Sequence, residues 1–166
     1  MSAPAGTRCL ARNLEDADRR WFAGGGVHVW LAKAADTAGA FLLFEMTLDA
    51  GKATPLHTHP ADEALVVLEG EILVHLDGSE HMIRTGGIAV APAGVPHAFL
   101  VSAGAARVLC LHTPGTCDAF YLDASDTIDA GTTTGVVDFE RIAESARDTG
   151  GMTLLGPPPF GADRAR

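Results

Sequence analysis

The feature that most constrains the fold is a succession of short strand patterns, separated by turns, between residues 27 and 123. The patterns are VHVWLAK (27–33), GAFLLFEMTLDA (39–50), LVVLEGEILVHLDG (65–78), IAVAP (88–92), PHAFLV (96–101), ARVLCLHT (106–113) and DAFYLD (118–123). Aliphatic, β-branched and aromatic residues favour strands, and Asp77-Gly78 is a strong hairpin signal. Nineteen glycines and nine prolines supply turns. We predict roughly eight to ten strands with little helix, which is typical of an all-β sandwich or jelly roll.

The segments on either side of these strands have a different character. Residues 1–26 form an N-terminal extension, irregular or partly helical, that ends in the flexible break at residues 24–26. Residues 124–166 begin as a polar linker and end in a proline-rich tail, GPPPF (156–160), which excludes regular helix and central strand. Between them, apolar residues recur at helical spacing over about 138–149, with Asp138 as the N-cap and Gly150 as the stop. We expect this C-terminal helix to pack on the barrel's own edge rather than on a partner.

Charge and cysteine content narrow the function and the compartment. The formal net charge of −9 offers no basic stripe for nucleic acid and disfavours anionic membranes. No stretch approaches the roughly 18 apolar residues of a membrane span, and the N-terminus carries charges where a signal peptide would be apolar. The three cysteines show no metal-ligand spacing and no disulfide framework. We therefore expect a cytoplasmic protein with neither a nucleic-acid nor a membrane partner.

Four residues that can bind a metal lie on two neighbouring strand-like stretches. His57 and His59 are one residue apart, so in a strand they share a face. Glu63 follows four residues later, and His97 comes from PAGVPH. Imidazole suits Fe, Ni, Cu and Zn, and a carboxylate adds Mn to this set. A buried, unpaired Glu63 would be costly without a cation, so we expect a divalent transition metal.

These residues fit two motifs of a known family. Residues 51–70 match the first cupin motif, G-(x)5-H-x-H-(x)3-E-(x)6-G, and residues 86–97 match most of the second, G-(x)5-P-x-G-(x)2-H. The chain thus resembles a small single-domain cupin of the quercetin dioxygenase-like group. It departs from the pattern at Val101, where asparagine is usual. The resemblance implies a double-stranded β-helix over residues 27–123, the ligand set His57, His59, Glu63 and His97, and a homodimer formed through an edge strand.

The substrate pocket and the reaction are less constrained than the metal. Alternate residues of a strand share a face, so the residues an even number of positions from a ligand are pocket candidates. A residue that ends a strand near the barrel mouth is another. The candidates are Leu65, Val67, Phe99, Val101 and His112. Three ligand imidazoles and one carboxylate in six-coordinate geometry leave two positions for a small organic molecule, O2 or water. We expect a metal-dependent oxidoreductase, dioxygenase-like, with Glu63 as the catalytic proton acceptor. The alternatives are a non-redox isomerase, cyclase or hydratase, and a small-molecule-binding cupin without catalysis, because fold does not decide chemistry.

Overall fold

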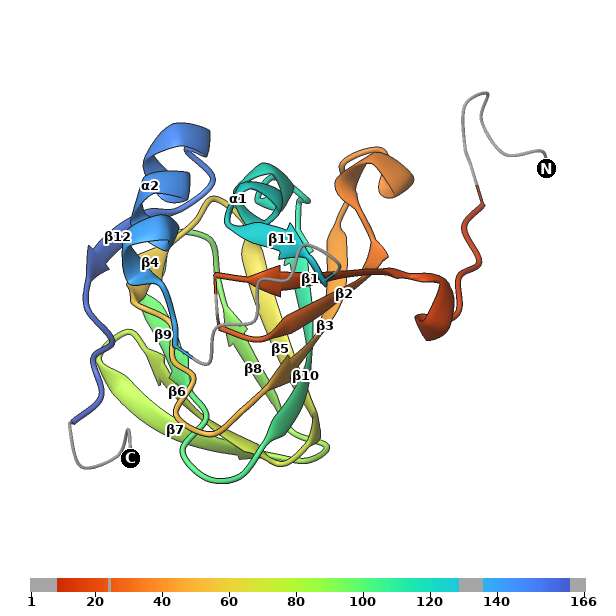
Figure 1. The fold of residues 1–166 in the computed structure, drawn as a ribbon. Helices are drawn as coiled ribbons and strands as arrows, with labels where there is room; N and C mark the ends of the chain where they lie inside the picture. The colour runs from red at the N-terminus through yellow and green to blue at the C-terminus, as the bar shows by residue number, and fades with distance from the viewer. Residues whose placement is uncertain (1–8, 24, 129–135, 162–166) are drawn as a thin grey trace.

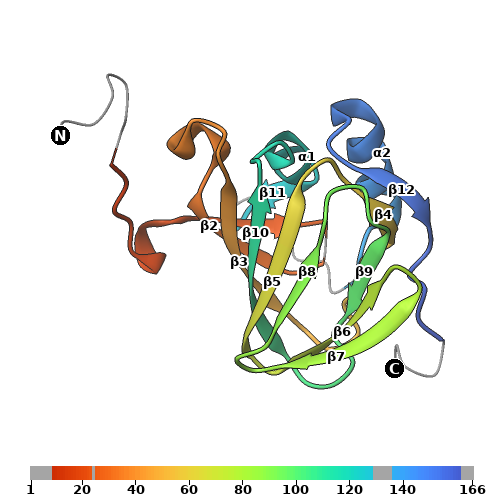
Figure 2. The same ribbon diagram turned by 180° about the vertical axis from the view of Figure 1, so that it is seen from behind.

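Two antiparallel sheets make up the protein. The computed structural model describes residues 9–23, 25–128 and 136–161, so Gly24 and half of the predicted polar linker lie outside the described residues. The larger sheet has the strand order β11 (Ser125–Thr127), β1 (Asp18–Phe22), β2 (Val27–Ala32), β3 (Leu42–Leu48), β10 (Ala106–Thr113), β5 (Asp62–Glu69) and β8 (Ile88–Ala91). The smaller sheet has the order β12 (Thr153–Gly156), β4 (Leu56–Thr58), β9 (His97–Leu100), β6 (Glu71–Leu76) and β7 (Ser79–Arg84). Figures 1 and 2 show the sheets facing each other, which confirms the predicted all-β jelly roll.

The hydrophobic core lies between the two sheets. Along β10, buried residues alternate with more exposed ones, so Val108, Cys110 and His112 point inward. Trp30 and Phe44 of the neighbouring strands are fully buried and stack with ring centroids 5.8 Å apart. Burial of such large side chains is the main favourable term in folding. The core thus holds the sheets at a separation that leaves room for a site near one end.

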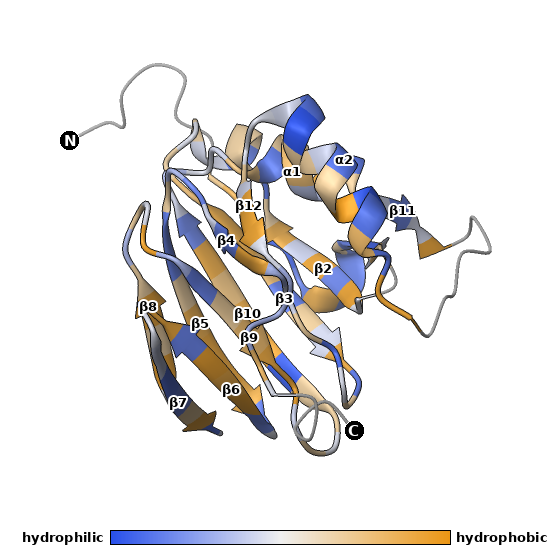
Figure 3. Cartoon of the chain, turned by 90° about the vertical axis from the view of Figure 1, so that its left-hand side faces the viewer, coloured by the Kyte–Doolittle hydropathy of each residue, from blue (hydrophilic) through white to orange (hydrophobic). Residues whose placement is uncertain are grey.

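The predicted C-terminal helix is present. Helix α2 runs from Phe139 to Thr149, and the Asp138 carboxylate accepts a hydrogen bond from the Arg141 amide at its N-terminus. It ends at Gly150, whose φ of 68° is the left-handed conformation that favours glycine. Figure 3 shows hydrophilic and hydrophobic residues alternating along α2, and its apolar residue Ile142 joins the hydrophobic core. The helix therefore packs on its own chain, as predicted.

One predicted strand is a helix. Residues Asp118–Asp123 form α1, and two short 3-10 helices occupy Leu14–Asp16 and Ala34–Thr37. Strand β10 already pairs with β3 on one side and β5 on the other, so β10 itself offers no free edge to the chain that leaves it. As a strand, the segment would turn Phe120 and Tyr121 to opposite faces. Helix α1 buries both of them at the end of the sandwich where α2 also lies (Figure 1).

Both sheets also include strands from outside residues 27–123. Strand β1 comes from the N-terminal segment and pairs with β2 and with β11, and β12 from the C-terminal segment pairs with β4. The division of the chain at residues 27 and 123 stays a prediction. Among the helices of the described residues, none has the length and apolar character needed to cross a membrane.

Candidate metal centre

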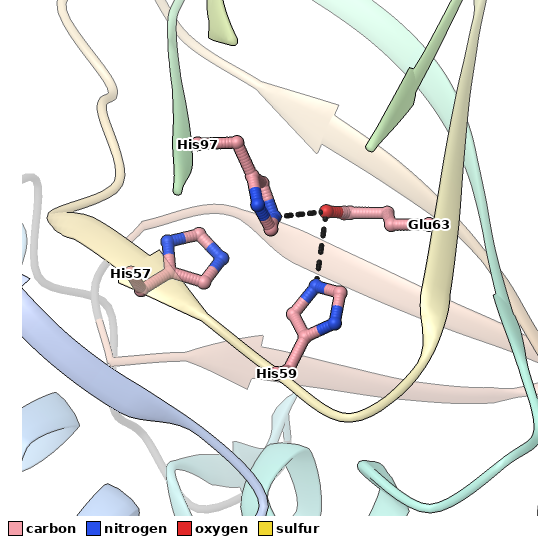
Figure 4. A group of neighbouring side chains, drawn as sticks. All are labelled: His57, His59, Glu63 and His97. Carbon is pink, nitrogen blue, oxygen red and sulfur yellow. Dashed lines mark hydrogen bonds and ion pairs between the residues drawn. The ribbon is translucent and has the colours of Figure 1, made fainter. Parts of the chain in front are cut away.

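The four predicted ligands lie together between the sheets, near the end covered by the helices. His57 lies on β4 and pairs in register with His97, the first residue of β9. His59 follows β4, and Glu63 lies near the start of β5 in the opposite sheet. Each side chain belongs to a residue that is 3–5% exposed. Their ligand atoms all lie within 4.8 Å of one another, and Figure 4 shows the four side chains turned toward a common centre.

Backbone carbonyls orient all three imidazoles in the same way. The Nδ1 atoms of His57, His59 and His97 each lie 2.8 Å from the carbonyl oxygen of a residue two positions away. A carbonyl oxygen can only accept a hydrogen bond, so each Nδ1 carries the proton. Each Nε2 therefore faces the centre, where it can bind a metal once it is deprotonated, and this is the orientation that a metal-ligating histidine requires. The local chain, rather than a distant partner, supplies this orientation.

Glu63 is the electrostatic centre of the cluster. Its Oε2 lies 2.7 Å from His97 Nε2 and 3.3 Å from His59 Nε2. Burial raises the pKa of Glu63, but the hydrogen bonds from His59 and His97 outweigh it, so the net pKa is well below its ordinary value. Burial lowers the pKa of His97, and the Glu63 carboxylate more than offsets this, so that pKa is raised. The carboxylate is ionised and attracts positive charge to this point.

For His57, the effects that lower the pKa outweigh those that raise it. Burial, followed by the charge of His97, lowers the pKa of His57 to about 3. The ring is neutral at neutral pH, which is the form that binds a metal. Three imidazoles and one carboxylate converge here, and this donor set fits a divalent transition metal.

Behind Glu63 lies a second layer of buried polar groups from β10 and α1. The Cys110 thiol donates to Glu63 Oε1 at 3.3 Å, and His112 Nε2 lies 3.7 Å from the same oxygen. Tyr121 Oη lies 3.1 Å from His112 Nε2. Burial raises the pKa of the Cys110 thiol well above its ordinary value, so it keeps its proton and remains a donor. Cys110 lies in the apolar strand pattern ARVLCLHT, and its contact with Glu63 depends on the register between β10 and β5.

A cavity of about 40 Å³ adjoins the cluster and is lined by His57 and Glu63. Of the predicted pocket residues, Phe99 lines it, whereas Leu65, Val67 and Val101 are part of the hydrophobic core. His112 is fully buried behind Glu63. Lys52 lines it from within the first motif, and the other lining residues include several from segments outside both motifs: Phe22, His28, Met46, Phe120, Tyr121, Ile142 and Met152. Many of them belong to β1, α1 and α2, whose positions depend on tertiary packing rather than on local sequence.

Comparisons with known proteins agree with this structure. Residues 44–112 match the family model described as "Cupin domain". The chain is 28% identical over 103 residues to quercetin 2,3-dioxygenase of Bacillus subtilis, covering 61% of this chain and 31% of that protein. It is 37% identical over 59 residues to the HTH-type transcriptional regulator PuuR of Escherichia coli, covering 35% of this chain and 32% of the regulator. The matches thus span about a third of the length of these two relatives.

A solved structure extends the likeness to the fold. The RmlC-like cupin of Shewanella frigidimarina superposes with a TM-score of 0.55 at 20% identity, over 60% of this chain and 86% of that one. Residues 44–112, which carry both motifs, therefore match a cupin domain.

Proposed function

We propose that the protein is a metal-dependent oxidoreductase, dioxygenase-like, that acts on a small organic molecule. His57, His59, Glu63 and His97 would hold one divalent transition metal, Fe, Ni, Mn, Cu or Zn. The observation that carries the proposal is the common orientation of the three imidazoles, whose Nδ1 atoms are all held by backbone carbonyls while Nε2 faces a buried carboxylate. The likeness to quercetin 2,3-dioxygenase supports the choice of an oxygenase over other cupin chemistries.

The protein's own groups account for substrate positioning and proton transfer. When bound, the metal supplies Lewis acidity, which lowers the pKa of a hydroxyl coordinated to it. Glu63 lines the cavity, so its carboxylate is placed to accept the proton of a substrate hydroxyl. The Cys110 thiol hydrogen-bonds Oε1 and holds the carboxylate in place. The apolar wall, which includes Phe99 and Phe120, excludes water from reactive species.

Elemental analysis of protein purified without added metal tests this proposal. We expect about one transition metal per chain, and the His59→Ala variant should lose more than about tenfold in metal affinity because a direct ligand is removed. His81→Ala is the matched control, since His81 is exposed on β7. A His59→Ala protein that keeps stoichiometric metal would contradict the ligand set.

Oxygen uptake then separates the candidate chemistries. An oxygen electrode, with a panel of catechols, enols and diketones, should record substrate-dependent O2 consumption by the metal-loaded protein. Zinc in the protein with no oxygen uptake would favour the non-redox isomerase, cyclase or hydratase instead. Tight binding of a panel compound without turnover would favour a binding cupin, the alternative that the likeness to part of the regulator PuuR supports.

We also infer a cytoplasmic homodimer formed through β8 and the outer face of the larger sheet. The three cysteines Cys9, Cys110 and Cys117 are free, as is usual in a reducing compartment.

Strand β8 ends its sheet and exposes Ile88 and Val90, which are 56% and 50% accessible. Apolar residues that are not fully buried continue this face across three further strands, in the register Val90, Ala64, Leu111, Leu43. A second copy of the chain would cover both this row and the open edge.

A further inference from the structure

His28 is a buried polar residue to which the chemistry above gives no role. It lies on β2 and is 2% exposed. Its ring is stacked between Phe22 and Phe44, with centroid distances of 4.8 and 4.7 Å and interplanar angles of 11° and 17°. Its Nδ1 has no hydrogen-bond partner among the described residues. A buried nitrogen without a partner destabilises a fold, so an apolar aromatic residue would suit this sandwich better than histidine does.

The cavity joins His28 to the metal ligands. His28, His57 and Glu63 all line the same volume of about 40 Å³, which has room for roughly three water molecules. A ligand held at His57 and Glu63 therefore occupies a cavity whose wall also includes His28. The remaining walls are mainly apolar, with Met46, Phe99 and Phe120 among them. Burial lowers the pKa of His28 to about 3, so the ring is neutral and offers one donor and one acceptor to an uncharged group.

We propose that His28 determines specificity by hydrogen-bonding an uncharged hydroxyl or carbonyl oxygen at the end of the ligand that lies away from the metal. The ligand class is a compact, mainly apolar molecule of few heavy atoms, with chelating oxygens at one end and a single neutral oxygen at the other. The proposal rests on the metal site proposed above and adds the substrate class to it.

Two probes that differ only at the distal end test the proposal. Acetohydroxamate and glycolohydroxamate chelate a metal through the same two oxygens, but the first ends in a methyl group and the second in a hydroxymethyl group. Calorimetric titration of the metal-loaded protein should show glycolohydroxamate binding about tenfold more tightly, the effect of one hydrogen bond to a buried polar group. The His28→Phe variant should lose this preference, since phenylalanine keeps the aromatic stacking and removes both nitrogens. His81→Phe, at an exposed position, should retain it.

Thermal unfolding of the same variant separates a ligand-binding role from a structural one. His28→Phe should melt at or above the wild-type temperature, because it removes an unpartnered buried nitrogen. A lower melting temperature with the probe preference intact would overturn the proposal, as would equal affinities of the wild-type protein for the two probes. Should His28→Phe not fold, the ring 15N shifts of wild-type His28 decide, because only glycolohydroxamate should move them. Metal content measured on the same samples shows separately whether the proposed metal site has failed.

Discussion

At the scale of single residues, the contact between Cys110 and Glu63 gives a matched pair of cysteine variants. The Cys110 thiol donates to Glu63 Oε1, whereas the equally buried Cys117 thiol donates to the Gly151 carbonyl oxygen. Cys110→Ala removes a hydrogen bond that holds a ligand carboxylate, so metal affinity should fall by about tenfold. Cys110→Ser should recover part of the loss, and Cys117→Ala should leave the affinity unchanged. Competition against a chromophoric chelator measures all three, and equal losses in Cys110→Ala and Cys117→Ala would refute this role.

Some residues of the site could be predicted from the sequence, and others could not. His57, His59, Glu63 and His97 are separated by short, fixed intervals within two strand–turn segments, so local geometry brings them together. His28, Cys110 and Tyr121 approach the site only through the pairing of distant strands and the docking of α1. Their positions depend on register, and a shift of one residue would turn each strand side chain to the other face. Val67 shares parity with Glu63, yet it faces the core farther along β5.

At the scale of elements, two glycines at strand junctions with similar backbone angles differ in their surroundings. Gly70 links β5 to β6 with a φ of 79°, and a Cβ there would lie 2.5 Å from the Ala105 carbonyl oxygen. Gly78 links β6 to β7 with a φ of 83°, and a Cβ there would meet no atom within 4 Å. Gly78→Ala should therefore cost about 1 kcal/mol for its backbone conformation alone. Gly70→Ala should cost about 2 kcal/mol or more beyond that, because backbone atoms must move.

Denaturant unfolding of both variants checks this difference through the shift in midpoint at constant m. Equal destabilisation would mean that the β5–β6 junction relaxes without strain.

The strands were easier to predict from the sequence than α1 was. Turn glycines and alternating apolar residues are local signals, whereas residues 118–123 are helical because β10 offers no free edge and two adjacent aromatic residues are buried on one side.

At the scale of the whole molecule, the outer face of the larger sheet predicts the oligomeric state. Size-exclusion chromatography with light scattering at micromolar concentration should give twice the chain mass of 17.2 kDa. Val90→Lys places a charge at the β8 end of the apolar row, next to the open edge, and should give a monomer, because burying an unpaired ammonium group outweighs the remaining apolar contacts. Met82→Lys is the control, since Met82 is an exposed apolar residue on β7 of the other sheet.

The site lies between the sheets, and its lining includes residues of β1, α1 and α2. In the strand order of the larger sheet, β1 is far from β8. Val90→Lys should therefore keep the metal content of the wild-type protein while it loses the dimer. A wild-type monomer would contradict the interface, and a dimeric Val90→Lys protein would place it on another surface. A monomer that also lost its metal would show that the second copy supports the site, since β8 pairs directly with the segment of β5 that carries Glu63.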